Sequence, residues 1–199
     1  RWASAGKAAQ GEIAARAESA DGPIFQAVRN IARDNGIAVV YGYPEVAEGK
    51  PYNSVQVVDR DGAALANYRK THLYGFDREF FTPGADWVAQ FELDGVTCGL
   101  LICYDIEFAP HIKALADRGT TLILCPTANM QPFTHVPEVT VRAMAANHGV
   151  AIAYANFCGA EGDLTYTGRS LIAGPHGEIL AQADTACYHA KSLGGNAIQ

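Results

Sequence analysis

Long hydrophobic runs, clusters of basic residues and paired cysteines are all missing from this sequence of 199 residues. No stretch approaches the roughly 18 consecutive apolar residues that a membrane-spanning helix needs, so we expect a soluble protein without a membrane partner. The formal net charge is −6, and no run rich in Lys or Arg offsets it. Because a nucleic-acid binder needs cations against the phosphate backbone, this balance argues against that class of protein.

The cysteines and histidines lack the spacing of a metal or redox site. None of the five cysteines forms a CxxC pair, which argues against a zinc ribbon or a thioredoxin-type motif. The six histidines are scattered, so we expect no metal site. Cys98, Cys103 and Cys125 lie in or beside apolar runs, where a reduced cysteine behaves as a small hydrophobe. A reducing cytoplasm is therefore the expected location.

The pattern of short apolar runs, turns and helical periodicity predicts the fold class. The length fits one domain over residues 1–199. Hairpins are predicted at 61–62, 94–95 and 175–177, strands over 37–41, 99–103, 121–125 and 150–154, and helices over 21–36, 108–117 and 136–148. Strands that are apolar on both faces need helices to cover them. We therefore expect an α/β protein, and the mixture of hairpins with crossovers predicts mixed sheets.

Cys103 is the first candidate for chemistry, because it ends an apolar strand directly before a turn into a helix. A nucleophile at such a turn points to the carboxyl edge of the sheet, where α/β folds open their clefts. Alternatively, Cys103 is one more buried thiol. Lys70 follows a strand and is weak evidence alone, while His72 competes as a base if it lies within hydrogen-bond reach of Cys103. The loop 126–129 follows a strand and contains small polar residues, so a part of the site and a simple turn are equally good interpretations.

Three segments, in their order, resemble the nitrilase (carbon–nitrogen hydrolase) superfamily. They are YRKTHLYGFDREFFTPG at 68–84, GLLICYDIEFAP at 99–110 and LILCPTANM at 122–130. The resemblance runs from about residue 21 to 183 and is greatest to aliphatic and stereoselective amidases. It implies a four-layer α-β-β-α sandwich, a Glu–Lys–Cys catalytic set, no metal or cofactor, and a homodimer or larger homo-oligomer.

The resemblance also implies roles for individual residues. Cys103 would be the nucleophile and Lys70 the catalytic lysine, so His72 would be structural. The Tyr104 amide and the Lys70 ammonium would form the oxyanion site. The expected reaction cleaves a carboxamide to carboxylic acid and ammonia through a cysteine thioester, with a carboxylate carrying the proton.

Two further positions have expected supporting roles. Asp77, counted back from Pro83-Gly84, falls on the family's second acidic position, whereas Glu79 is out of register. We expect Asp77 to orient Lys70 or the attacking groups. Asn129 is expected either to bond the polar group of the substrate or to cap its turn.

The family's catalytic glutamate belongs to a segment that precedes the helix starting near Gly22. Because the sequence starts at Arg1, we expect a fragment that lacks this segment, with a further strand also missing at the C-terminus, and therefore little activity. Glu45 follows an apolar strand but aligns with a later strand of the family, so we treat it as a lookalike. Glu12 and Glu18 are weaker candidates, because no strand precedes them.

The sequence therefore predicts an amidase that acts on non-peptide carbon–nitrogen bonds of a small molecule. A nitrilase that acts on nitriles shares the same residues, and a non-catalytic scaffold or binding paralogue would keep the fold. Phe80, Phe81, Phe133 and Tyr154 are candidate walls of a substrate pocket, although aromatic residues in such positions are more often part of the core.

Overall fold

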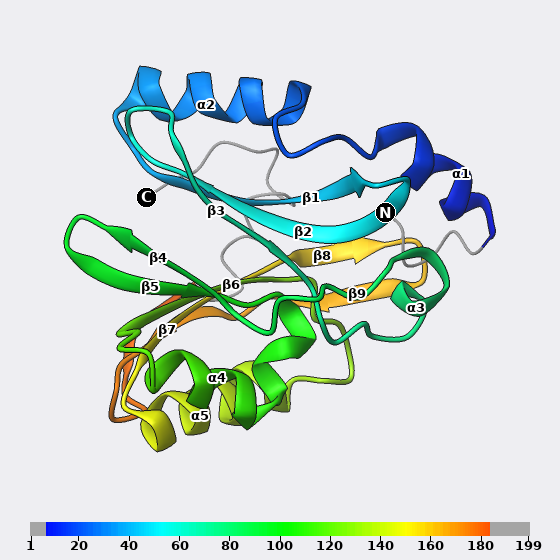
Figure 1. Ribbon diagram of the computed structural model, residues 1–199. Helices are drawn as coiled ribbons and strands as arrows, with labels where there is room; N and C mark the ends of the chain where they lie inside the picture. Colours follow the sequence, from blue (N-terminus) through cyan, green and yellow to red (C-terminus); the bar gives the residue numbers. More distant parts are fainter. Residues whose placement is uncertain (1–6, 184–199) are drawn as a thin grey trace, which may run out of the picture.

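Two β-sheets lie face to face in the computed structural model, which describes residues 7–183, and helices cover their outer faces (Figure 1). The first sheet has the order β1-β2-β3 and the second has the order β11-β10-β7-β6-β5-β4. Helix α2 covers the first sheet, and α4 and α5 cover the second (Figure 1). This arrangement confirms the predicted four-layer α-β-β-α sandwich.

The elements follow one another in a simple order along the chain. The helices are α1 (Lys7–Arg16), α2 (Pro23–Asn35), α3 (Asp77–Phe80), α4 (Ala109–Ala116) and α5 (Val141–His148), with a 3₁₀ turn over Cys103–Glu107 and a π-helical turn over Val136–Thr140. The strands are β1 (Val39–Ala47), β2 (Lys50–Val58), β3 (Ala64–Arg69), β4 (Ala89–Leu93), β5 (Val96–Leu100), β6 (Leu122–Thr127), β7 (Ala151–Asn156), β8 (Cys158–Glu161), β9 (Leu164–Thr167), β10 (Ser170–Ala173) and β11 (Ile179–Ala183).

The second sheet is mixed, as expected, because β5, β6 and β7 are parallel while its other neighbours pair antiparallel. The first sheet is antiparallel throughout, so the expectation of mixed sheets holds for the larger sheet alone. Parallel strands need crossovers, which α4 and the segment with α5 supply. The carboxyl ends of β5, β6 and β7 consequently meet at one edge.

Apolar residues on both faces of β5 and β6 divide the core into two clusters. Val57, Leu100 and Phe91 belong to the cluster between the two sheets. Leu101 and Ile123 belong to the cluster between the second sheet and its helices. Both faces of these strands are thus buried, which is the reason for their continuous hydrophobic runs.

Local turn signals place most elements correctly. Helix α2 has Pro23 in its first turn and ends at Gly36, whose φ of 62° provides the left-handed cap, although Gly22 and not Asp21 is the N-cap residue. The β4–β5 hairpin turns at Asp94 and Gly95, both with positive φ. The predicted helix over 136–148 divides into a π-helical turn and α5.

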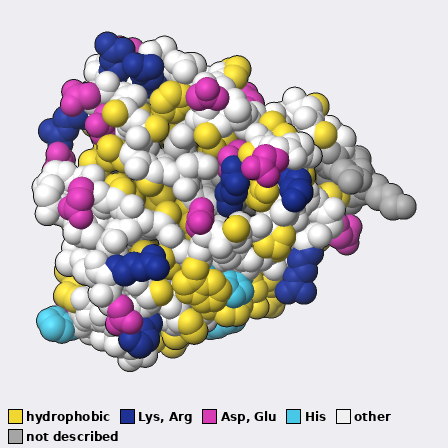
Figure 2. Space-filling model, viewed as in Figure 1, with side chains coloured by type: hydrophobic (Ala, Val, Ile, Leu, Met, Phe, Trp, Pro, Cys, Tyr) yellow, Lys and Arg dark blue, Asp and Glu magenta, His cyan; other side chains and the backbone are white. Residues whose placement is uncertain are grey.

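The charge of the surface and the length of the helices are as follows. Basic and acidic side chains alternate over the face shown in Figure 2, without a large patch of one sign. Among residues 7–183, no helix is both long and apolar enough to span a membrane.

Candidate active site

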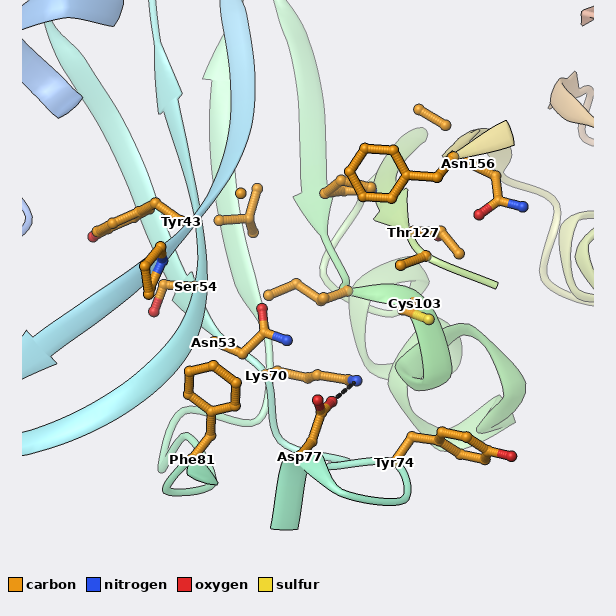
Figure 3. Close-up of a pocket in the computed structure, with 18 of the residues that line it drawn as sticks. Tyr43, Asn53, Ser54, Lys70, Tyr74, Asp77, Phe81, Cys103, Thr127 and Asn156 are labelled. Carbon is orange, nitrogen blue, oxygen red and sulfur yellow. Dashed lines mark hydrogen bonds and ion pairs between the residues drawn. The ribbon is translucent and has the colours of Figure 1, made fainter. Parts of the chain in front are cut away.

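A cavity of about 510 Å³ opens between the two sheets where several strands end (Figure 3). Its walls come from β1 and β2, the segment after β3, and α3. The segment after β5, the end of β6 with the loop that follows, and the ends of β7 and β9 complete them. Lys70, Asp77 and Cys103 all line it. The structure therefore brings together three residues that lie up to 33 positions apart in the sequence (103 − 70 = 33).

Cys103 occupies a sharp turn between β5 and the helix-bearing segment that follows. Its φ of 49° is in the left-handed region, which is unusual for a residue with a side chain and costs conformational energy. Burial raises the pKa of the Cys103 thiol, while the charge of Lys70 and a hydrogen bond from the Ala128 backbone amide lower it. Burial prevails, so the pKa stays above its ordinary value and the resting group is a thiol.

Lys70 extends from the end of β3 into the cavity, where Nζ lies 2.6 Å from Oδ2 of Asp77 (Figure 3). Burial lowers the pKa of Lys70, but the negative charge that Cys103 has when it is ionised, the charge of Asp77 and the hydrogen bond to Asp77 outweigh it. The pKa is therefore raised, and Lys70 remains an ammonium. Asp77 is at the start of α3, which packs its Phe80 into a small cluster with Ile13 of α1.

Gly84 ends the segment that begins at Lys70, and its backbone is in contact with the backbone of Lys70. Its amide donates to the Lys70 carbonyl at 2.9 Å, and a Cβ at this position would lie only 2.2 Å from the Arg69 carbonyl oxygen. A larger residue would push the segment away from the strand. Glycine at position 84 thus has a steric reason. Asp77 was identified by counting back from this glycine and Pro83.

Tyr104 and Asn129 differ in how the structure places them. Tyr104 follows Cys103 in the turn, but its ring packs on Tyr74 and Phe108 and lies outside the cavity lining. Asn129 does not line the cavity either. Its Nδ2 donates to the Phe133 carbonyl at 2.8 Å. This contact holds the loop, as the turn-capping alternative for Asn129 expects, and a contact of Asn129 with a substrate stays a prediction.

Glu45 lies in a buried, hydrogen-bonded group outside the cavity lining. Its side chain is 2% exposed and receives hydrogen bonds from Arg69, Ser54 and Asn67. Burial raises the pKa of Glu45, but these hydrogen bonds and the Arg69 charge leave it below its ordinary value. Glu45 does not line the cavity. The lookalike interpretation agrees with this geometry.

The other acidic candidates also lie outside the cavity lining. Glu18 accepts a hydrogen bond from the Ile24 amide at 2.6 Å and so caps the start of α2, and Glu12 lies on α1 beside Arg16. Glu79 belongs to α3 but is absent from the lining residues. Asp77 is the carboxylate that lines the cavity within residues 7–183.

His72 belongs to a separate buried group and not to the cavity. Its ring stacks on Phe108 at a centroid distance of 3.7 Å, and its Nδ1 lies 3.4 Å from Asp105. His72, Asp105 and His111 have possible ligand atoms within 4.8 Å of one another. No sequence pattern indicated this group, because its members are distant in the chain.

The aromatic walls were only partly predicted. Phe80 and Phe81 line the cavity, whereas Tyr154 and Phe133 pack in or against the cluster beneath the helices. The remaining aromatic walls are Tyr43, Tyr74, Phe76, Phe157 and Tyr166. Asn53, which the sequence analysis did not single out, lines the cavity and points toward Lys70 (Figure 3).

A four-layer sandwich with a cysteine, a lysine and a carboxylate in one cavity is the arrangement that the resemblance implied. The chain belongs to the carbon–nitrogen hydrolase family, whose profile matches residues 4–186. The predicted membership of the nitrilase superfamily is confirmed.

Relatives of the chain include characterised amidases. It is 48% identical over 173 residues to a Pseudomonas protegens protein described as "Hydrolase in pqqF 5'region", covering 86% of this chain and 61% of that protein. It is 36% identical to an (R)-stereoselective amidase of Pseudomonas sp., covering 86% of this chain and 62% of the relative. The chain thus spans about three fifths of the length of these relatives.

A solved relative has the same fold. It is the amidase of Nesterenkonia sp. AN1, as a cysteine-to-alanine variant in complex with butyramide, with a TM-score of 0.76, 37% identity, and coverage of 80% of this chain and 62% of that one. Glutamate-to-leucine and glutamate-to-glutamine variants of that amidase show the acetamide moiety of fluoroacetamide added covalently at the active-site cysteine.

Proposed function

We propose that this protein hydrolyses an uncharged carboxamide to a carboxylic acid and ammonia, with Cys103 as the nucleophile. The observation that supports this most is the Lys70–Asp77 ion pair, which holds an ammonium in the cavity that contains the Cys103 thiol. A cation at this place stabilises both the thiolate and the oxyanion that follows its attack.

The proposed reaction has two steps. Cys103 attacks the amide carbon, its proton passes through a carboxylate to the departing nitrogen, and ammonia leaves behind a thioester. Water then hydrolyses the thioester with the same carboxylate as base. Lys70 and the Tyr104 amide are the proposed oxyanion donors, and Asp77 holds Lys70 in place. No glutamate of residues 7–183 lines the cavity, so the glutamate expected from the resemblance is not one of these.

The charge of the cavity favours an uncharged substrate. Within the described residues, Lys70 and Asp77 are the charged side chains that line it, and they pair with each other at 2.6 Å. The other walls are aromatic, aliphatic or neutral polar. A charged acyl group would lose hydration there without gaining a partner. Butyramide, the ligand of the Nesterenkonia amidase, is an uncharged amide of this kind.

Trapping with fluoroacetamide tests this proposal, followed by intact mass and peptide mapping. We expect one acetamide adduct, on Cys103, that is absent in Cys103→Ala. Butyramide should slow the labelling, whereas succinamate and 4-aminobutanamide at the same concentration should not. Labelling that reaches Cys158 equally, or that butyramide leaves unchanged, would contradict a substrate site at Cys103.

Ammonia release then separates the alternatives. Ammonia from butyramide and not from butyronitrile supports the amidase, and the reverse result supports a nitrilase. A chain that neither forms the adduct nor releases ammonia is the non-catalytic paralogue.

A further inference from the structure

We propose that Asp105 is a positioning residue that fixes Lys70 against Cys103 by binding the backbone segments beside both of them. The inference rests on the proposed function and adds to it a residue outside the cavity lining. Asp105 is fully buried and lies two positions after Cys103.

Each oxygen of the Asp105 carboxylate receives hydrogen bonds from two donors. Oδ2 accepts from the Ile102 amide and from the Tyr68 hydroxyl, each at 3.1 Å. Oδ1 accepts from the His72 amide at 2.9 Å and from the Thr71 hydroxyl at 3.2 Å. One carboxylate therefore joins two segments that are more than thirty positions apart.

Two of these donors belong to immediate neighbours of the proposed reacting residues, and the other two, Tyr68 and His72, each lie two positions from Lys70. Ile102 precedes Cys103, and Thr71 follows Lys70. Ile102 is held from both sides, because the Asp105 amide also donates to its carbonyl at 3.1 Å. A shift of Asp105 would therefore change the distance between the Lys70 ammonium and the Cys103 sulfur.

The same contacts also restrain the strained backbone of Cys103. A non-glycine residue at a φ of 49° persists only where its surroundings hold it. The two bonds between Asp105 and Ile102 provide this restraint on the N-terminal side of the turn. Asp105 thus fixes the Cys103 end of the distance between the thiol and the Lys70 ammonium.

Aromatic rings shield the carboxylate from water. His72 stacks on Phe108 at 3.7 Å, and His111 stacks on Trp87 at 4.0 Å. Hydrogen bonds in such dry surroundings are electrostatically stronger than in water. The same group has the residue types of a metal site, but the four donors already engage both Asp105 oxygens, and the Thr71 hydroxyl lies 3.4 Å from Nε2 of His111. The contacts are those of a hydrogen-bonded clamp.

The test is a double-mutant cycle that reads the rate of fluoroacetamide trapping at Cys103. Asp105→Asn keeps the shape but places an amide NH₂ against two of the donors. We expect trapping to slow by about ten- to a hundredfold, the effect of misplacing a reacting group by about an ångström. In a Lys70→Met background the same substitution should change the rate by less than about threefold, because there is no longer an ammonium to align. Asp117→Asn, at an exposed ion pair with Lys113, is the matched control and should leave trapping unchanged.

The outcomes separate a positioning role from a purely structural one. Equal slowing by Asp105→Asn in both backgrounds, or an unchanged rate in a folded Asp105→Asn protein, would overturn the proposal. If Asp105→Asn does not fold, Thr71→Val removes one donor with little change in shape, and its effect on trapping must likewise depend on Lys70. Failure of the unsubstituted protein to form the adduct instead contradicts the proposed function, and the same cycle is then read with iodoacetamide.

Discussion

Replacing Lys70 by methionine isolates the contribution of one charge to the reactivity of Cys103. Lys70 is 3% exposed, so methionine fills nearly the same buried volume without the ammonium. Asp77 loses its partner, but its side chain is 23% exposed and can be hydrated. The fold should therefore survive. The thiol loses the charge that lowers its pKa and keeps the negative charge of Asp77, which raises it.

The size of the effect follows from the usual influence of a nearby charge. An opposite charge near an ionisable group changes its pKa by about 1–3 units. The thiolate fraction below the pKa then falls by about 10- to 1000-fold. A more basic thiolate is intrinsically more nucleophilic, with a Brønsted coefficient of about 0.4–0.5, which offsets nearly half of the loss on a logarithmic scale. Alkylation of Cys103 should consequently slow by about 3- to 60-fold.

The assay is the pseudo-first-order rate of iodoacetamide alkylation, assigned to Cys103 by peptide mapping across about pH 6–10, which spans the ordinary cysteine pKa of ~8.5. In Lys70→Met the pH profile should shift upward as the rate falls. The control is Lys113→Met, since Lys113 is 64% exposed and pairs with Asp117. An unchanged rate and an unchanged profile in Lys70→Met would show that the ammonium does not act on the thiol, and the proposed mechanism would fail.

Two further predictions concern stability. Glu45→Gln should lower the free energy of unfolding by about 1–3 kcal/mol, less than for a fully buried pair because Arg69 is 36% exposed. It should leave the trapping of Cys103 unchanged. Urea denaturation measures the change in stability, with the exposed Glu12→Gln as control, and loss of trapping at full stability would make Glu45 a base. Burial, with the nearby charge of His72, holds the pKa of His111 below its ordinary value despite Asp105 and the Trp87 carbonyl. The unfolded chain therefore binds more protons below about pH 6.5, so stability should fall as the pH falls through that range, and His111→Asn, but not exposed His176→Gln, should flatten this slope.

The parts of the fold that were predictable are those with local causes. Asp94-Gly95 forms its turn because the two residues tolerate positive φ, and Gly36 ends α2 for the same reason. The continuous apolar runs of β5 and β6 required layers on both sides. Each of these signals lies within a few residues of its effect.

Elements that depend on distant partners were either not predicted or predicted to be too short. Strand β1 was expected to end at residue 41, yet it continues to Ala47 through Gly42 and Pro44. Proline is tolerated there because β1 is an edge strand of its sheet. The β8–β9 hairpin was not predicted, because its strands are only four residues each and show little alternation.

The residues of the candidate site also divide into those with a local sequence signal and those that depend on distant partners. Asp77 was found through its register with Pro83-Gly84, a local relation that the steric constraint at Gly84 explains. Asp105 was quoted only as part of a motif, because its partners Tyr68 and Thr71 lie 37 and 34 positions away. Such contacts have no periodicity or spacing that a single sequence could reveal.

Cys125 shows why an apolar strand ending in cysteine does not by itself make a nucleophile. It lies on β6 with its sulfur 4.0 Å from the Cys103 carbonyl oxygen, and burial raises its pKa far above the ordinary value, although the Thr127 hydroxyl opposes this. Burial also raises the pKa of Cys103, but there the charge of Lys70 and the Ala128 amide oppose it. Two neighbouring thiols in similarly apolar runs thus differ because only Cys103 faces the buried ammonium. The proposed reactivity of Cys103 therefore depends on the position of its sulfur, because that position places the thiol beside the ammonium of Lys70.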